Sequence, residues 1–177
     1  MSLPNASAPV ITTARFELWQ PVASDLAELF SLTEDDETRR FLGPVPASMK
    51  DSFDRLHRHA GSWALHGYGS LCVRQTGQSA IVASCGIFQS WRDKPGLNDV
   101  PEAGWITHRD WRGKGVAGEA MAAVLDWFDR AHGPQRIGCM IEHGNAPSER
   151  LAATLRFVEY ARQDDEEGKV VVIYARG

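Results

Sequence analysis

One strand, helix and strand unit in the middle of the chain constrains the fold more than any other feature. A strand over residues 102–108 leads through the glycine-bearing segment Arg112–Gly118 into a helix that ends at Gly133-Pro134, and residues 136–141 form the next strand. Hairpins surround this unit, whereas a repeating βαβ fold would contain several such units. The pattern predicts an α+β fold with a mixed, mostly antiparallel sheet. The seven expected strands span residues 13–19, 70–74, 80–89, 102–108, 136–141, 157–162 and 169–175.

Four helices are expected to flank this sheet. The first begins at Ser24-Asp25, the third is the central helix, and Asn145 caps the fourth. The second begins at Ser48, and Asp51 stands three residues further on, as in a capping box. Apolar residues at alternating steps of four and three predict that one stripe of this second helix faces the core. The stripe consists of Met49, Phe53, Leu56, Ala60 and Trp63.

The composition is that of one globular domain. The chain has 177 residues, of which 43% are hydrophobic and 24% are charged, and this proportion can bury a sizeable core. We expect a disordered N-terminus over residues 1–10 and a single domain over residues 11–177. The formal net charge of −4 argues against a surface built to hold nucleic acid or anionic lipid.

The sequence shows neither a membrane span nor a secretory signal. Its longest apolar run, residues 170–175, is far shorter than the ~20 residues that span a bilayer, and the N-terminus lacks a basic start followed by an apolar stretch. Cys72, Cys85 and Cys139 are an odd number without a CxxC pair, and each lies among strand-like apolar residues. We interpret them as reduced core thiols and expect a cytoplasmic protein.

The segment Trp111–Ala117 carries the most informative chemistry. Gly113 and Gly115 flank Lys114 directly before a helix, and Arg112 precedes them. Glycines allow a tight backbone whose N–H groups point at one place, and the helix N-terminus adds partial positive charge. The six residues that end at Lys114 sum to +2, from three basic residues and one acidic residue. This combination suits a pyrophosphate; a strand-to-helix turn with solvated charges is the structural alternative.

Two other phosphate-binding patterns compete for this segment. A Walker loop is excluded because no GxxxxGK[ST] occurs. Gly113-x-Gly115-x-x-Gly118 does match the dinucleotide fingerprint, so an NAD-dependent oxidoreductase is a remote alternative. Polar and bulky residues over 108–112 fill the approach to the first glycine, the match lies late in the chain, and the other strands pair in hairpins. These three features count against the dinucleotide interpretation.

Four segments of the chain match one family pattern in the correct order. Arg112-x-x-Gly115-x-Ala117 fits the (Q/R)xxGx(G/A) signature for acetyl-CoA. The other segments are Thr13-Ala14-Arg15-Phe16-Glu17-Leu18, Glu102-Ala103-Gly104-Trp105, and Asn145-x-x-Ser148-x-x-Leu151 with the later Leu155-Arg156-Phe157. Together they resemble the GNAT N-acetyltransferases, in particular the branch of the ribosomal-protein acetyltransferases RimJ and RimL. The resemblance covers nearly the whole chain and implies a GNAT-like sheet that is splayed between strands four and five.

The resemblance also implies acetyl-CoA as cosubstrate and a role for each matching residue. Backbone groups of Ile106 and Thr107 would pair with the pantetheine arm like an extra strand, and Asn145 would hydrogen-bond to the pantetheine or to a water near the thiol. The family attacks the thioester directly with an amine, so Cys139 is not needed as a nucleophile. The pyrophosphate would be held by backbone amides of Arg112, Gly113, Lys114, Gly115, Val116 and Ala117.

Direct attack needs a neutral amine and a stabilised oxyanion. The pKa of an alkylammonium is ~8 to 10.4, so at neutral pH a base must take its proton. Glu102 is the candidate base, directly or through water, and the alternative is a strand-end carboxylate paired with an arginine. His108 is the second candidate. A strand-four N–H, that of Ile106, would polarise the thioester carbonyl.

The leaving thiolate needs an acid, and here the sequence departs from the family. Many relatives place a tyrosine in the last helix, where this chain has Ala152. Ser148 is the remaining candidate, although it is equally explained as a serine that hydrogen-bonds locally. Arg156 stands where the family usually has glycine, which puts the local helix end in doubt. Five further histidines form no i,i+4 pair, so we expect no metal site.

The expected activity is the transfer of an acetyl group from acetyl-CoA to a primary amine. A CoA-binding sensor or scaffold that has lost turnover is the alternative. The acceptor is open between a protein N-terminus, an aminoglycoside-like amine, and a small polyamine or amino acid. Trp63, Trp91 and His66 could line its site. We expect no nucleic-acid or membrane partner, and the sequence leaves monomer or homodimer open.

Overall fold

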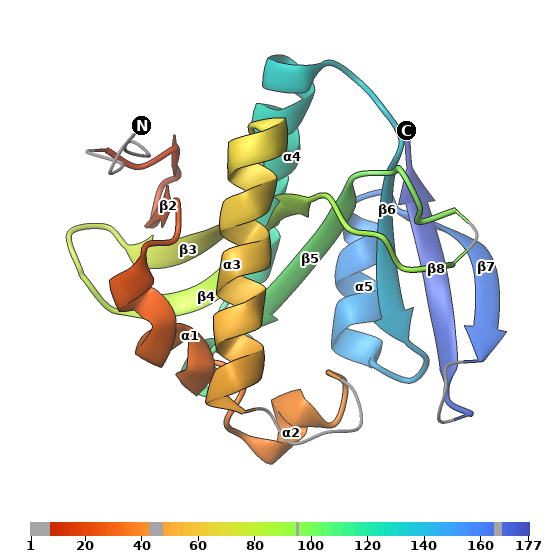
Figure 1. Cartoon of the computed structure of the whole chain (residues 1–177), viewed down its shortest axis with the longest axis horizontal. Coiled ribbons are helices and arrows are strands. Elements are labelled where there is room, and N and C mark those ends of the chain that lie inside the picture. Colours follow the sequence, from red (N-terminus) through yellow and green to blue (C-terminus); the bar gives the residue numbers. More distant parts are fainter. Residues whose placement is uncertain (1–7, 43–47, 95, 165–167) are drawn as a thin grey trace.

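A computed structural model describes residues 8–42, 48–94, 96–164 and 168–177. Its strands form one sheet in the order β1-β2-β3-β4-β5-β6-β8-β7. Neighbouring strands are antiparallel except β5 and β6, which are parallel. The predicted α+β class and mixed, mostly antiparallel sheet are therefore confirmed (Figure 1). The strands are β1 (Ile11–Thr12), β2 (Phe16–Trp19), β3 (Ser70–Gln75), β4 (Ile81–Phe88), β5 (Glu102–Thr107), β6 (Ile137–Glu142), β7 (Val158–Asp164) and β8 (Val170–Arg176).

The first expected strand is in fact a small hairpin. The N–H of Thr13 donates to the carbonyl of Phe16 at 2.8 Å, and this turn joins β1 to β2, which pair through Ile11 and Leu18. Of the expected strand over residues 13–19, only the part from Phe16 onward is therefore a strand. The described part of the sheet accordingly has eight strands rather than about seven.

The helices comprise the four expected ones and one further short helix. They are α1 (Leu26–Ser31), α2 (Asp36–Arg39), α3 (Met49–His66), α4 (Val116–His132) and α5 (Ala146–Thr154), with short 3-10 turns at Ala23–Asp25 and Arg109–Trp111. The additional helix, α2, has four residues and no apolar periodicity, so its pattern carries no helical signal. Its N-cap is Asp35, whose side chain accepts from the N–H of Thr38.

The sheet separates two helical layers. Helices α1 and α3 cover one face, and α4 and α5 cover the other (Figure 1). Because side chains alternate along a strand, β5 contributes to both layers. Ile106 packs with Leu32, the C-cap of α1, and with Cys72, whereas Trp105 packs on the main core and donates a hydrogen bond to Ser148 of α5.

Helix α3 follows its start signal but not its expected stripe. Ser48 forms the predicted capping box at its N-terminus. Met49 and Phe53, however, are each 46% exposed, while Ser52 is buried. In the first two turns of α3, the buried face is therefore rotated away from the apolar stripe. Leu56 belongs both to the stripe and to the buried face. The expectation that the whole stripe faces the core is therefore wrong for its first two residues.

The three cysteines are free and buried, as expected. Burial raises the pKa of the Cys85 thiol to about 12, and burial also raises the pKa of Cys72 and Cys139. These thiols therefore stay protonated and enclosed in the core. In the described part of the chain, no helix is long and apolar enough to cross a membrane.

Strands β5 and β6 diverge after one pair of residues. Their pairing is limited to Glu102 and Gly138, next to a hydrogen bond from the N–H of Gly138 to the carbonyl of Pro101 at 2.9 Å. Figure 1 shows the two strands spreading apart toward their C-terminal ends. This is the predicted splay between the fourth and fifth expected strands.

Candidate active site

The glycine-bearing segment forms an open helix start at the end of β5. Gly113 and Gly115 have φ values of 71° and 75°, in the left-handed region that favours glycine. Gly115 is the N-cap of α4, and no side chain of a described residue caps this end. The amides of the first helical turn therefore have no partner within the helix, which makes the site suitable for an anion.

The side chain of Arg112 points away from this helix start. Its guanidinium binds the carboxylate of Asp35 at 2.7 and 2.8 Å and that of Glu37 at 2.7 Å, and it also contacts the hydroxyl of Thr38. Burial alone would raise the pKa of Asp35, but the hydrogen bonds from Arg112 and Thr38 outweigh it and lower the pKa to about 2. The carboxylates of Asp35 and Glu37 thus offset the charge of Arg112. The net charge of +2 counted for residues 109–114 is therefore not fully available to a ligand at this helix start.

The groups of the glycine-bearing segment that can bind an anion are the Lys114 ammonium and the backbone amides. The ammonium group of Lys114 lies 5.1 Å from the centre of the Trp111 ring, in a cation–π arrangement. It forms no ion pair within the described residues. The predicted pyrophosphate contacts are made by backbone amides of the segment, so they do not depend on the Arg112 side chain.

An arginine from the N-terminal hairpin holds the first turn of α4 in place. The guanidinium of Arg15 binds Glu119 at 2.6 Å and donates to the carbonyl of Lys114 at 3.0 Å. The hydroxyl of Thr13 adds a second bond to Glu119 at 2.6 Å. Burial alone would raise the pKa of Glu119, but hydrogen bonds from Thr13 and Arg15 lower it. No local pattern in the sequence predicts this contact between Arg15 and Glu119, and the family match at residues 13–18 is the signal that could have indicated it.

The backbone of β5 presents an unpaired edge to the splay. The N–H of His108 donates to the carbonyl of Val82 on β4 at 2.9 Å, and Ile106 pairs with Ser84 in the same ladder. Backbone groups alternate in direction along an antiparallel strand. The N–H and C=O of Ile106 therefore point at β4, and those of Trp105 and Thr107 point toward β6.

Glu102 is the first residue of β5 and its carboxylate is buried. Its side chain is 4% exposed. Arg92 binds it with two hydrogen bonds of 2.8 Å, and the hydroxyl of Ser90 donates to the same carboxylate. The arginine pairing that the sequence left open as an alternative is thus present. One oxygen, Oε1, receives only one of these bonds, so it keeps a lone pair.

The other polar candidates also have partners. The side chain of Asn145 accepts from the N–H of Ser148 at 3.3 Å and caps α5 as predicted. The hydroxyl of Ser148 accepts from the indole N–H of Trp105 at 3.3 Å, which links α5 to β5. His108 lies beyond the end of β5, where its Nδ1 accepts from the N–H of Asp110 at 3.3 Å. Among the described residues, no group of three His, Cys, Asp or Glu is arranged to hold a metal ion.

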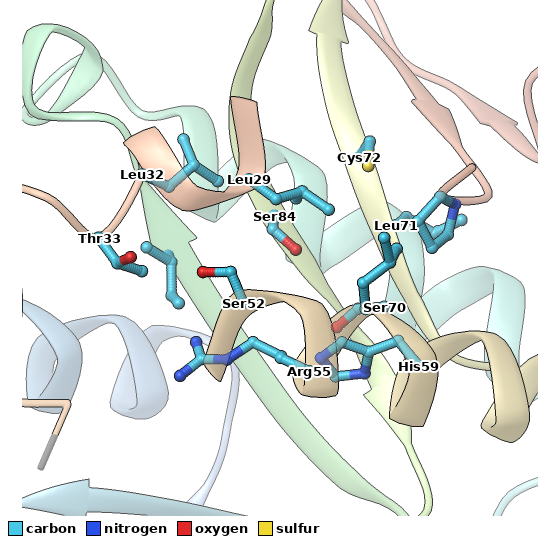
Figure 2. A pocket seen from close by; sticks show the side chains of 13 residues that line it. Leu29, Leu32, Thr33, Ser52, Arg55, His59, Ser70, Leu71, Cys72 and Ser84 are labelled. Atoms are coloured by element: carbon cyan, nitrogen blue, oxygen red, sulfur yellow. The ribbon is translucent and has the colours of Figure 1, made fainter. Parts of the chain in front are cut away.

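A pocket lies on the α1 and α3 side of β5 (Figure 2). We call it the α1–α3 pocket. The three residues proposed from sequence for the acceptor side are not among its lining: Trp63 donates to the carbonyl of Ser70, His66 stacks on Tyr68, and Trp91 is 65% exposed. The lining includes Leu29, Leu32, Ser52, Arg55, His59, Ser84 and Ile106.

Comparison with known proteins agrees with this geometry. The model of a family described as an acetyltransferase (GNAT) domain matches residues 15–158, most of the chain. The chain therefore belongs to the GNAT acetyltransferases. This match includes the glycine segment, so the segment is explained without a dinucleotide-binding fold.

Solved structures place the chain within the same fold. A GNAT-family protein from Bordetella pertussis superposes with a TM-score of 0.82 and 25% identity, over 94% of this chain and 98% of that one. The ribosomal-protein-S5-alanine acetyltransferase of Vibrio fischeri gives a TM-score of 0.75 at 14% identity, over 94% of each chain. The protein yncA of Salmonella typhimurium, solved with its cofactor acetyl-CoA, gives 0.70 at 19% identity, over 91% and 92%. The last two similarities support the fold alone.

Proposed function

We propose that the protein transfers an acetyl group from acetyl-CoA to a primary amine by direct attack in a ternary complex. The observation that carries this proposal is the splay between β5 and β6, which leads to the uncapped, glycine-lined start of α4. A bound acetyl-CoA in the related fold of yncA is consistent with it. The absence of a disulfide among three buried thiols is consistent with a cytoplasmic location.

The pyrophosphate of acetyl-CoA would lie against the amides of residues 112–117. The helix N-terminus favours negative charge there, and Lys114 adds a full positive charge. Arg15 and Glu119 act as positioning residues, because they fix the turn that carries these amides. Arg112 fixes the same turn from the other side through α2.

The pantetheine arm would lie along the free edge of β5. The family resemblance implied backbone contacts from Ile106 and Thr107. The register favours Trp105 and Thr107 for these contacts, because the backbone of Ile106 is directed at β4. By the same alternation, an N–H of Trp105 or Thr107 is the better candidate to polarise the thioester carbonyl. Asn145, at the start of α5, would reach the arm from the β6 side.

At neutral pH the acceptor starts as an ammonium, so the reaction forms one C–N bond, breaks one C–S bond and takes two protons from the nitrogen, of which one ends in solvent and one on the thiolate. The amine nitrogen attacks the carbonyl carbon of the thioester, and the C–S bond breaks to leave the CoA thiolate. We assign the first proton, which the ammonium loses before the attack, to Glu102, which takes it through the lone pair that Oε1 keeps, directly or by way of a water, and releases it to solvent. The second proton leaves the nitrogen as the amide forms and is taken up by the thiolate, which leaves as CoA. The hydroxyl of Ser148 is the candidate relay for this proton, or the ligand of a water that carries it.

A CoA-binding module without turnover is the second candidate function. Two observations favour it: Ala152 is fully buried where many relatives carry a tyrosine, and Arg92 already occupies both oxygens of Glu102. A module of this kind would keep the open helix start and the splay but would lack an efficient acid and base.

Thiol release and calorimetry separate the two candidates. The full chain is incubated with acetyl-CoA and a panel of amines and N-terminal peptides, free thiol is followed with Ellman's reagent, and acetylated product is identified by mass. Amine-dependent release above the background hydrolysis supports transfer. CoA binding without release across the panel supports the binding module. No detectable CoA binding at millimolar ligand overturns both.

A further inference from the structure

The α1–α3 pocket combines an apolar wall with one cationic side chain. Leu29 of α1, Leu32 directly after it and Ile106 of β5 supply apolar lining, and Arg55 extends into the pocket from α3 beside Ser52 (Figure 2). Sites for small molecules usually join mostly apolar walls to a few placed polar groups. The pocket therefore has the chemistry of a site for a small ligand.

Arg55 has no counter-ion in the described part of the chain. Its side chain forms neither an ion pair nor a hydrogen bond with any described residue. Burial lowers the pKa of Arg55, and repulsion from Arg58 and Arg92 acts in the same direction, while Asp51 attracts it only weakly. Arg92, in contrast, is neutralised by Glu102. The pocket thus carries a positive charge that no described residue compensates and that is partly removed from water.

The remaining polar groups of the pocket are neutral. The hydroxyl groups of Ser52 and Ser84 form no side-chain hydrogen bond with another described residue. The Nδ1 atom of His59 is buried and has no partner among the described residues. Burial lowers the pKa of His59 to about 3, with the charges of Arg55 and its neighbours acting in the same direction, so the imidazole is neutral at physiological pH. Donors and acceptors are available here without a second charge.

The pocket lies against the strand that would carry the thioester. The side chain of Ile106 lines it, and the adjacent residues Trp105 and Thr107 have the backbone groups that face the splay. A ligand in the pocket would therefore lie beside the proposed position of the acetyl group, where an acceptor amine must be.

We propose that the acceptor is a small amine that also carries a carboxylate, and that Arg55 binds this carboxylate in the α1–α3 pocket. A guanidinium matches a carboxylate with two parallel hydrogen bonds, and one free guanidinium matches one negative charge. The apolar wall fits an aliphatic or aromatic side chain. A polyamine is disfavoured, because the charge of Arg55 would repel it. This inference rests on the proposed function.

Matched substrate pairs test the proposal by turnover. Leucine is compared with 3-methylbutylamine, phenylalanine with 2-phenylethylamine, and β-alanine with both propylamine and 2-aminoethylphosphonate, each with the full chain and saturating acetyl-CoA. We expect kcat/KM to be at least about tenfold higher for the carboxylated member, which corresponds to one charge-assisted contact. A preference for the phosphonate, for the amines without a carboxylate, or for spermidine overturns the proposal.

Substitution of Arg55 separates recognition from the intrinsic reactivity of each amine. In Arg55→Gln, kcat/KM for the carboxylated member is expected to fall about 10- to 100-fold, while that for the member without a carboxylate stays within about twofold. Arg58→Gln, an exposed arginine on the same helix, is the matched control and is expected to change neither. Arg55→Lys keeps the charge and is expected to restore part of the preference. An equal loss for both members in Arg55→Gln overturns the proposal.

A binding measurement distinguishes failure of this inference from failure of the proposed function. CoA-loaded protein is titrated calorimetrically with leucine and with 3-methylbutylamine. Turnover of amines without a carboxylate preference leaves the transfer function standing and overturns the inference. Binding of leucine at least about tenfold tighter than the amine, lost in Arg55→Gln but with no turnover of either, supports the pocket assignment and overturns the transfer. Absence of both turnover and selective binding overturns both.

Discussion

Replacing Glu102 by glutamine tests whether its carboxylate acts as a base or only as the partner of an arginine. The substitution keeps the size of the side chain but removes its charge and its capacity to take a proton. The native carboxylate is 4% exposed and receives two bonds of 2.8 Å from Arg92 and one from Ser90. Both chemistry and stability are therefore expected to change, and the two must be separated.

The structure sets the size of each effect. Loss of general base catalysis costs about 10²- to 10⁴-fold in turnover, so we expect kcat of Glu102→Gln to fall at least ~10²-fold with little change in the affinity for acetyl-CoA. A weakened charge-assisted pair costs about 1–3 kcal/mol. The side chain of Arg92 is 34% exposed and can be hydrated once the pair is weakened, so we expect a cost near the lower end of this range. At about 2–4 °C per kcal/mol for a chain of this size, the melting temperature should fall by about 2–6 °C.

Arg92→Gln is the matched control, because it breaks the same pair but keeps the carboxylate. Turnover is measured by thiol release with amine saturating, across pH 6 to 9, and CoA affinity by calorimetry. If Glu102 is the base, Arg92→Gln should keep kcat within about tenfold of wild type. Wild-type turnover in Glu102→Gln, or equal losses in the two variants, would refute the assignment and leave the pair with a structural role only.

Three further predictions concern stability and thiol chemistry. Gly86→Ala should lower the free energy of unfolding by more than about 2 kcal/mol in urea titrations, because a Cβ at Gly86 would lie 2.5 Å from the carbonyl of Gly69; a smaller loss would mean that the two strands can move apart. Because the pKa of Asp35 is lowered to about 2, its pair with Arg112 stabilises the fold above about pH 4 and loses this effect as the pH falls through 2. Asp35→Asn should therefore be less stable than wild type by about 1 kcal/mol at pH 7, after allowance for solvent screening, and the difference should vanish near pH 2; a gap that is the same at both pH values contradicts this. Ellman's reagent should react with less than one thiol in the native protein and with three in denaturant, since Cys85 and the other two cysteines are buried; rapid native labelling would place a thiol at the surface.

Local patterns in the sequence were enough to predict the fold class and the glycine-bearing turn before α4. The capping box at Ser48, the glycines at 113 and 115 and the Asn145 cap each depend on atoms within a few residues of one another. Contacts between residues so close in the chain can be predicted from residue type and spacing alone. The strand, helix and strand unit, together with the surrounding hairpins, then restricted the sheet to a mixed one.

Tertiary structure alone decided what the charged side chains do. Arg112 looked like a phosphate ligand, but its partner Asp35 lies 77 residues away in the chain. The apolar spacing of α3 did not show that its first turns are rotated outward, and nothing near Arg55 in sequence shows that it lines a pocket without a counter-ion. Periodicity records which side chains are apolar, whereas charge pairing and pocket lining depend on elements far apart in the chain that meet only after folding.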